Sequence, residues 1–323
     1  MDGEIFRRDF TEYLEEAVGH ENALIALSAL RSPSSASVRL SPHKNGASFP
    51  CGTEAVPWNG YGLMLESRPS FTLDPYLHAG GYYVQDSSSM FVGHVLRQLL
   101  PDLADRIGRP VLALDLCAAP GGKATDAAAS LRQVFGDSFL LVANEVVRQR
   151  AAVLADNAAV WGDPCVMVTS SDPERFLMLP ETFDIIICDV PCSGEGMFRK
   201  DPKALEQWSP ETVSLCEARQ RRIVADAWES LASGGILLYS TCTFNTREND
   251  GNVEWICSSL GGTPIDVPGT DGFAGVLKTR FGHLLVPGLV KGEGQYCAAI
   301  RKKGEAQGRE KRQVRKRSGG AGG

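Results

Sequence analysis

From residue 111 onward, short apolar segments alternate with longer segments of helical periodicity, and this alternation constrains the fold more than any other feature. We expect strands at 111–116, 139–143, 166–169, 183–188 and 235–240. We expect helices at 122–135, 147–159, 210–232 and 246–260. Strands that are apolar throughout are typical of parallel sheets with helices on both faces. The sequence therefore predicts an α/β fold with a mostly parallel sheet.

The first third of the chain lacks this alternation, and we expect it to form a smaller α+β domain. Apolar residues recur at helical spacing across 6–30, and a segment rich in Ser, Pro and Gly follows at 32–52. We expect short strands at 38–40 and 82–84, and a helix at 88–100 that Ser87 or Ser88 caps.

Composition excludes several classes of protein. No run of about 18 apolar residues exists, which predicts that no segment spans a membrane. The N-terminus lacks the apolar core of a secretion signal. Nine cysteines form an odd number without the spacing of a disulfide framework, so we interpret them as cytosolic thiols. The sequence thus predicts a cytoplasmic protein.

Charge is distributed unevenly along the chain. The formal net charge is −6, yet residues 301–323 carry nine Lys or Arg and two Asp or Glu. Composition favours a solvated, disordered tail for this basic segment. It does not by itself indicate a nucleic acid partner.

A glycine-containing loop, Asp115 to Lys123, follows the first strand and opens a helix, where doubly wound folds bind ligands. It is not a phosphate-binding P-loop, because Cys117 and Ala124 stand where Gly and Ser or Thr are required. The dinucleotide fingerprint G-x-G-x-x-G is also absent. Glu145 follows the second strand, where an acid can bind a ribose diol, although it could also merely cap a helix. We favour an adenosyl ligand.

Two cysteines follow two further strands. Cys192 comes after 183–188 and Cys242 after 235–240, so both are expected at the sheet edge that carries the glycine loop. A thiolate there could attack carbon. The alternative is that these cysteines are small buried apolar residues. We assign that role to the other cysteines within apolar segments, Cys165, Cys188, Cys216, Cys257 and Cys297.

A zinc site is the other interpretation of the cysteines. Only one loose pair exists, Cys188 and Cys192, and no histidine lies near it in the sequence. Structural zinc sites normally combine two such pairs. We therefore expect no metal.

These segments resemble the Nol/Nop/Sun family of RNA cytosine-5 methyltransferases. The matching motifs are DLCAAPGGKA (115–124), FDIIICDVPCSGEGMFRKDP (183–202) and GGILLYSTCTFNTREND (234–250). The segments VPWNGYGL, RPSF and HAGGYYVQDSSSMF, within 56–91, look closest to the RsmF-like branch, which modifies 16S ribosomal RNA. The resemblance runs from about residue 30 to 300. Full-length relatives usually continue beyond the catalytic core into a further RNA-binding module.

The resemblance implies a Rossmann-like S-adenosylmethionine-dependent methyltransferase fold. It implies three segments: an N-terminal RNA-binding or accessory domain (1–105), a catalytic domain (106–302) and a basic tail (303–323). The implied S-adenosylmethionine site consists of Cys117, Ala118, Ala119, Pro120, Gly121, Gly122, Lys123, Glu145, Asp172 and Asp189. Cys242 matches the family's nucleophile, and Cys192 matches the cysteine that assists product release.

The implied chemistry is consistent with these residue types. Carbon-5 of cytosine is a poor nucleophile, and attack of the Cys242 thiolate on carbon-6 creates an enamine that can take a methyl group at carbon-5. Asp189 could hydrogen-bond ring nitrogen-3 if it is protonated, as a buried carboxyl can be. The carbon-5 proton must then leave so that the thiol is eliminated, and Cys192 is placed for that step.

The substrate follows from the resemblance and not from charge. The base must be flipped out of any helix to reach the thiols. Ribosomal RNA is the favoured partner, for a monomeric enzyme without membrane or metal. Transfer RNA and a catalytically silent RNA-binding assembly factor remain alternatives. Candidate phosphate contacts, which could equally form surface salt bridges, are Arg199, Lys200, Lys203, Arg219, Arg221 and Arg222.

Overall fold

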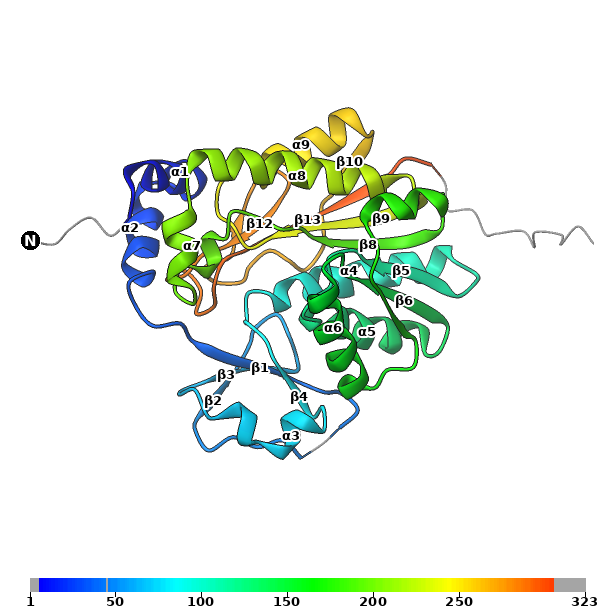
Figure 1. Cartoon of the computed structure of the whole chain (residues 1–323), viewed down its shortest axis with the longest axis horizontal. Coiled ribbons are helices and arrows are strands. Elements are labelled where there is room, and N and C mark those ends of the chain that lie inside the picture. The colour runs from blue at the N-terminus through cyan, green and yellow to red at the C-terminus, as the bar shows by residue number, and fades with distance from the viewer. Residues whose placement is uncertain (1–5, 45, 305–323) are drawn as a thin grey trace, which may run out of the picture.

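The described part of the chain centres on a nine-stranded sheet. A computed structural model describes residues 6–44 and 46–304 (Figure 1). Five adjacent strands are parallel, in the order β9-β8-β5-β6-β7. They are β5 (Val111–Asp115), β6 (Phe139–Asn144), β7 (Val166–Thr169), β8 (Phe183–Asp189) and β9 (Leu231–Thr241). The chain winds outward from β5 to β7 and then returns to β8, so the strand order reverses between β5 and β8.

An antiparallel extension continues the sheet beyond β9. β13 (Gln295–Lys302) pairs with β9, β12 (Gly282–Leu285) pairs with β13, and β11 (Leu277–Lys278) pairs with β12. β10 (Gly262–Ile265) pairs with the far end of β13. The sequence analysis did not anticipate these strands, because glycine and proline interrupt the apolar pattern after residue 260. The predicted α/β fold with a mostly parallel core sheet is confirmed.

Helices cover both faces of the sheet (Figure 1). On one face lie α4 (Met90–Arg106), α5 (Gly122–Phe135) and α6 (Arg148–Trp161). On the other lie α8 (Pro210–Trp228) and α9 (Asp250–Ser259). No helix in residues 6–44 or 46–304 is long and apolar enough to cross a membrane.

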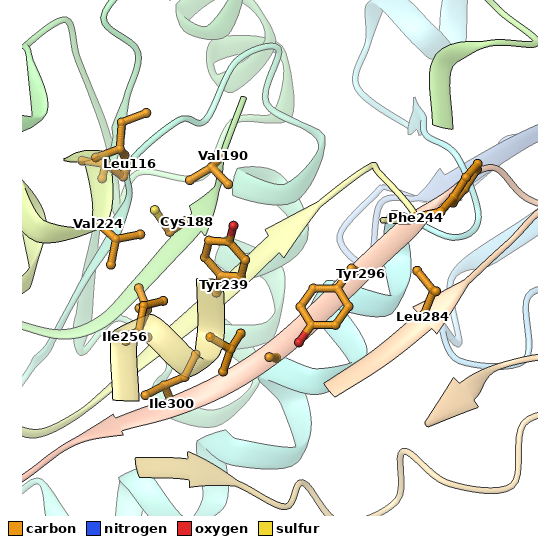
Figure 2. Packing of buried hydrophobic residues seen from close by; sticks show 14 of the residues in the cluster. Leu116, Cys188, Val190, Val224, Tyr239, Phe244, Ile256, Leu284, Tyr296 and Ile300 are labelled. Atoms are coloured by element: carbon orange, nitrogen blue, oxygen red, sulfur yellow. The ribbon is translucent and has the colours of Figure 1, made fainter. Parts of the chain in front are cut away.

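Strand residues alternate between these two helical layers. In β8, Ile185 and Ile187 pack in the cluster that contains α4 and α5, whereas Ile186 and Cys188 pack in the cluster that contains α8. Figure 2 shows the second cluster, with Cys188 and Tyr239 of the sheet packed near the helical layer. Full burial of one aliphatic side chain stabilises the fold by about 1.5–3 kcal/mol, so two-sided burial fixes the sheet position strongly.

The helical pattern across residues 6–30 forms two helices. α1 (Arg8–Val18) and α2 (His20–Ala29) are separated at Gly19, whose φ is 80°. Both pack on the α8 side of the large sheet. The ring of Phe10 lies 5.1 Å from Phe198 and 5.5 Å from Trp208, measured between ring centroids. These helices therefore share the core of the larger domain.

A small antiparallel sheet precedes the large one. Its order is β2-β3-β1-β4, with β1 (Ala36–Leu40), β2 (Thr53–Ala55), β3 (Gly62–Leu65) and β4 (Tyr82–Val84), beside the short helix α3 (Pro75–His78). The predicted strands at 38–40 and 82–84 are confirmed. The shorter remaining elements are η1 (Phe71–Leu73), η2 (Pro173–Met178), η3 (Glu195–Met197) and α7 (Pro202–Gln207).

A buried arginine fixes the small sheet to the glycine loop. Arg39 of β1 donates hydrogen bonds to the Gly122 carbonyl (3.2 Å) and to Thr125 Oγ1 (2.6 Å). Its guanidinium also stacks on the ring of Trp161, 4.5 Å from the centroid. Arg39 is 1% exposed. Removing a buried charged donor leaves its acceptors unpaired, so this contact ties the two sheets firmly together.

Two predicted helices begin later than expected. α4 starts at Met90 and continues through Pro101, and its N-cap residue Ser89 makes no capping bond but donates to Gln295. α9 starts at Asp250 instead of residue 246, because the residues after Cys242 form a hydrogen-bonded loop. Most of the basic tail, from residue 305, lies outside the described residues.

Candidate active site

The glycine loop forms one half of the candidate site. β5 ends at Asp115, and Gly121 has a left-handed φ of 114° at the N-cap of α5. A Cβ at Gly121 would lie 3.3 Å from Leu154, and its backbone conformation strongly favours glycine. The loop borders a pocket at the point where the strand order reverses, the usual ligand position in this architecture.

Both sheets line this pocket. The larger domain contributes Asp115, Cys117, Ala118, Ala119, Pro120, Gly122, Lys123 and Asp189. Strand β4 of the small sheet and the loop that follows it contribute Tyr83, Val84, Gln85, Asp86 and Ser89. The sequence analysis gave this second group no role, although it lies within the YYVQDSSSMF match. That match was the available signal.

Asp115 is buried at the base of the pocket without hydrogen-bond partners. The residue is 0% exposed, and neither carboxyl oxygen bonds to any group in the described residues. Burial, with the nearby charge of Asp189, raises the pKa of Asp115 to about 8. Such a group is costly for the free protein and is available to a ligand. The sequence analysis placed Asp115 on the loop but did not assign it to the site.

Asp189 lies at the end of β8 and forms an ion pair. Its Oδ2 lies 2.9 Å from Lys123 Nζ, and its Oδ1 accepts a hydrogen bond from Ser240 Oγ at 2.7 Å. Burial opposes the charge on Lys123, but Asp189 outweighs it, and the pKa of Lys123 is raised. Asp189 is thus held between the Lys123 ammonium and the Ser240 hydroxyl.

Glu145 fits both interpretations that its position allowed. Its Oε1 accepts a hydrogen bond from the Val147 amide at 2.9 Å, next to the start of α6. Its Oε2 is buried without a hydrogen bond, although Arg150 Nη1 lies 3.2 Å away. One oxygen thus binds near the helix end, and the other forms an ion pair without a hydrogen bond among the described residues. Asp172 caps η2 through the Glu174 amide, and neither Asp172 nor Glu145 lines the pocket around Asp115.

The two cysteines form the other half of the site. β8 and β9 are adjacent and parallel, with Asp189 opposite Ser240, so the loops that follow them meet at one sheet edge. The Sγ atoms of Cys192 and Cys242 lie 2.9 Å apart, and both residues are partly exposed. Contact with Cys242 and burial raise the pKa of Cys192 well above its usual value. Cys192 therefore keeps its proton and can donate it toward Cys242.

The cysteines that we assigned to the apolar interior differ in how deeply they are buried. Cys188, Cys216 and Cys297 are buried, whereas Cys165 and Cys257 are only partly buried. Within the described ranges, no three His, Cys, Asp or Glu side chains form a group that could hold a metal ion.

One candidate phosphate contact is wrong. The Arg199 side chain is 7% exposed and pairs with Glu293 at 2.7 Å, so it is part of the interior. Lys200 lies 3.4 Å from Asp86, and Arg221 pairs with Glu217 at 2.6 Å. These pairings agree with the salt-bridge alternative.

Fold and site together define a protein class. A parallel sheet that reverses order at a glycine loop, with helices on both faces, is a doubly wound, Rossmann-like fold, and solved methyltransferases share it. NSun6 from Pyrococcus horikoshii, solved with SFG, matches with a TM-score of 0.77 and 19% identity, over 94% of this chain and 100% of that one. A methyltransferase homologue from Pyrococcus horikoshii matches with a TM-score of 0.73 and 23% identity, over 92% and 95%. At these identities the likeness concerns the fold.

Sequence comparison identifies the family. The model for 16S rRNA methyltransferase RsmB/F matches residues 108–300, and the model for the N-terminal domain of 16S rRNA methyltransferase RsmF matches residues 6–87. The chain belongs to the RsmB/F family, which confirms the resemblance drawn from its motifs.

Curated relatives carry the name ribosomal RNA small subunit methyltransferase F. The protein from Serratia proteamaculans is 36% identical over 263 residues, which cover 77% of this chain and 51% of the relative. The protein from Aliivibrio fischeri is 35% identical over 85% of this chain and 59% of the relative. The chain thus spans between one half and three fifths of the length of these relatives.

Proposed function

We propose that this chain is an S-adenosylmethionine-dependent methyltransferase that forms 5-methylcytosine in RNA, with 16S ribosomal RNA as substrate. The observation that carries the proposal is the 2.9 Å contact between Cys192 and Cys242 beside the glycine-loop pocket. Family membership and the names of the curated relatives support the RNA target. We further propose a cytoplasmic monomer whose N-terminal segment, 1–105, assists RNA binding.

The residues of the pocket fit S-adenosylmethionine, which supplies an electrophilic methyl group when it is bound. The carboxyl of Asp115, which has no hydrogen-bond partner among the described residues, suits a cationic amino group, and Glu145 Oε2, which pairs only with Arg150, suits a ribose hydroxyl. We retain Cys117, Ala118, Ala119, Pro120, Gly121, Gly122, Lys123, Glu145 and Asp189 as proposed cofactor residues. Asp172 rests on the family resemblance alone.

The cysteines divide the chemistry between them. Cys242 attacks carbon-6 of the cytosine, which forms a carbon–sulfur bond and makes carbon-5 nucleophilic. The Cys192 thiol, held protonated beside Cys242, stabilises that attacking thiolate by donating a hydrogen bond. Bond formation consumes the negative charge on Cys242, which removes the largest cause of the raised pKa of Cys192. Cys192 can then lose its proton to water and accept the carbon-5 proton, and the carbon–sulfur bond breaks with Cys242 leaving as a thiolate.

Asp189 orients the base in this scheme. Its carboxylate, paired with Lys123, can accept a hydrogen bond from the exocyclic amino group of cytosine. This group distinguishes cytosine from uracil, since uracil presents a carbonyl oxygen at the same position. We therefore propose a selective role for Asp189 in place of the neutral one first expected.

The test compares Cys192→Ala with Cys242→Ala on a denaturing gel. Each protein is incubated with S-adenosylmethionine and with 16S ribosomal RNA, assembled small subunits or transfer RNA. We expect a covalent protein–RNA band only for Cys192→Ala, and only with a small-subunit substrate. A band only for Cys242→Ala would reverse the roles, and a band only with transfer RNA would change the substrate. If neither variant gives a band and calorimetry detects no S-adenosylmethionine binding, the proposed function is wrong.

A further inference from the structure

Glu195, on the loop that carries Cys192, binds the backbone that follows Cys242. Its Oε2 accepts hydrogen bonds from the amides of Phe244 (2.6 Å) and Asn245 (3.1 Å). Its Oε1 accepts one from the indole of Trp208 (2.9 Å). The Cys242 carbonyl also accepts a bond from the Gly196 amide at 2.8 Å. The position of Cys242 is therefore fixed from the loop of the other cysteine.

Glu248, on the loop that carries Cys242, does the reverse. Its Oε2 accepts hydrogen bonds from the amide of Ser193 (3.1 Å) and from Gln220 Nε2 (2.6 Å). Ser193 directly follows Cys192. Asn245 Nδ2 lies between the two carboxylates and donates to Glu195 Oε1 (2.9 Å) and Glu248 Oε1 (2.8 Å). Each cysteine is thus held by a carboxylate from its partner's loop.

The cost of this arrangement indicates a purpose beyond stability. Glu195 is 1% exposed and Glu248 is 0% exposed. Among residues 6–44 and 46–304, neither carboxylate pairs with a cation, and only neutral donors hold them. Burying two nearby carboxylates without a cation is expensive, and apolar packing would be cheaper. Burial, with the nearby charge of Glu195, raises the pKa of Glu248 to about 7.

We propose that Glu195 and Glu248 form a crossed clasp of two positioning residues, in which each acts on the step performed by the cysteine of the other loop. Glu195 places Cys242 for carbon–sulfur bond formation. Glu248 places Cys192 for proton removal and release of the product. This inference rests on the proposed function, because the two steps are those of the covalent mechanism. An error of about 1 Å in the position of a reacting group can cost about 100-fold in rate.

The crossing makes the proposal testable with two isosteric variants, Glu195→Gln and Glu248→Gln. Glu248→Gln is expected to accumulate the covalent RNA adduct with both cysteines present, because release slows by 10-fold or more. Glu195→Gln is expected to slow adduct formation by a similar factor, also in the Cys192→Ala background. Where a Gln variant fails to fold, the Asp variant replaces it, since Asp keeps the charge but is too short to reach the same amides.

Asp163→Asn is the matched control. Asp163 is a buried carboxylate at the opposite edge of the sheet, where it pairs with Arg132 at 2.6 Å. Its loss lowers stability but leaves the ratio of adduct formation to adduct release unchanged. If Glu195→Gln and Glu248→Gln slow both steps equally, in proportion to their loss of stability, the crossed assignment is wrong.

A second readout does not depend on RNA chemistry. Diamide oxidises two neighbouring thiols to a disulfide and is itself reduced to the hydrazine, taking up both protons and both electrons. Both clasp variants are expected to slow formation of the Cys192–Cys242 disulfide, followed by peptide mass spectrometry, while Asp163→Asn matches the parent. A parent that forms this disulfide, together with a Cys192→Ala variant that gives no RNA adduct, would refute the proposed function and leave the positioning role standing. Disulfide formation at the parent rate in both clasp variants would overturn the clasp.

Discussion

The glycine-loop pocket and the cysteine loops lie at the same edge of the sheet, and buried acidic residues occur in both regions. The two regions differ in whether the carboxyl oxygens of these residues accept hydrogen bonds. Among the described residues, both carboxyl oxygens of Asp115 and one of Glu145 are buried without a hydrogen-bond partner, although the Glu145 oxygen forms an ion pair with Arg150. Glu195 and Glu248 have both oxygens bonded to neutral donors. The acids near the pocket keep acceptor oxygens that a ligand can use. The acids of the cysteine loops instead use their acceptor oxygens in hydrogen bonds that hold those loops in place.

This difference reflects two ways to build a site. A ligand that supplies its own donors needs unpartnered acceptors, and the free protein is less stable for having them. A reacting pair of side chains needs fixed positions, which a fully satisfied network provides. The contrast therefore predicts which substitutions weaken the fold, which weaken ligand binding, and which do both.

The largest expected effect concerns Asp115. Because its pKa rises from 3.8 to about 8 on folding, stability is highest below pH 4 and falls as the pH rises to 8. The fall attributable to this carboxyl is roughly 6 kcal/mol at most. Asp115→Asn is expected to remove it, which makes the variant more stable than the parent at pH 9. The same variant should bind S-adenosylmethionine about 10- to 100-fold more weakly, because a charged hydrogen bond is lost.

Urea unfolding at pH 5 and pH 9, with calorimetry of S-adenosylmethionine binding, checks both effects. A variant that gains stability but keeps its affinity would show that the carboxyl serves something other than the cofactor. Equal stability differences at the two pH values would show that Asp115 is ionised or protonated alike in both states of the chain.

Glu248 should show a smaller pH effect and no effect on the cofactor. Its pKa rises from 4.5 to about 7 on folding, so the parent loses stability between these pH values, by roughly 3 kcal/mol at most. Glu248→Gln lacks that loss, but it keeps only one acceptor oxygen, so its amide NH2 faces either the donors Ser193 and Gln220 or the donor Asn245. The variant is therefore expected to be less stable than the parent at pH 5, with a gap that narrows toward pH 8.

Thermal unfolding across this pH range measures the gap. Unchanged affinity for S-adenosylmethionine would sharpen the contrast with Asp115, and an affinity loss as large as that of Asp115→Asn would break it. A gap that stays constant between pH 5 and pH 8 would show that Glu248 is ionised throughout, against the direction of its pKa.

Glu145 is an intermediate case, because only one of its two carboxyl oxygens accepts a hydrogen bond. Its substitution tests whether such a residue contributes mainly to ligand binding or mainly to stability. Glu145→Gln keeps an acceptor for the Val147 amide, but an uncharged NH2 group replaces the oxygen that pairs with Arg150. We expect little change in stability and about 10-fold weaker binding of S-adenosylmethionine, from the loss of one charge-assisted bond. Binding measured with adenosine should weaken by the same factor if the contact is to the ribose. A change in stability without a change in affinity would support the capping role alone.

The sequence predicted the parts of this site that follow from strand order. The apolar segments placed β5 to β9 within a few residues, and the loops after β5, β8 and β9 carried the glycines and both cysteines. It missed β10 to β12, which have two to four residues each and lie among glycines and prolines, and it also missed the eight-residue strand β13. The sequence also did not show that Asp115 lacks hydrogen-bond partners, or that Glu195 and Glu248 each bind the loop of the other residue. Hydrogen-bond partners of this kind depend on packing between segments that are distant in the sequence. The prediction that Arg199 contacts phosphate was wrong for the same reason, because its partner Glu293 is distant from it in the sequence.

The smallest expected effect tests the reach of the small sheet into the pocket. Tyr83 Oη donates a hydrogen bond to the Pro120 carbonyl of the glycine loop at 3.0 Å and accepts one from Asn157. Tyr83→Phe removes both bonds, at about 1 kcal/mol each, and leaves the ring. We expect a loss of affinity for S-adenosylmethionine of only a few-fold, since the loop shifts without losing a ligand contact.

Tyr82→Phe is the matched control for Tyr83. Tyr82 is the adjacent residue of β4, and its hydroxyl donates to Asp74 at 2.7 Å, within the small sheet and its helix. The control should lower stability by a similar amount and leave affinity unchanged. If both variants lower affinity alike, the small sheet acts on the pocket through its overall stability. If only Tyr83→Phe does, the sheet acts through one hydrogen bond to the loop, and the ligand-binding half of the site is built from two domains while the cysteine half is built from one.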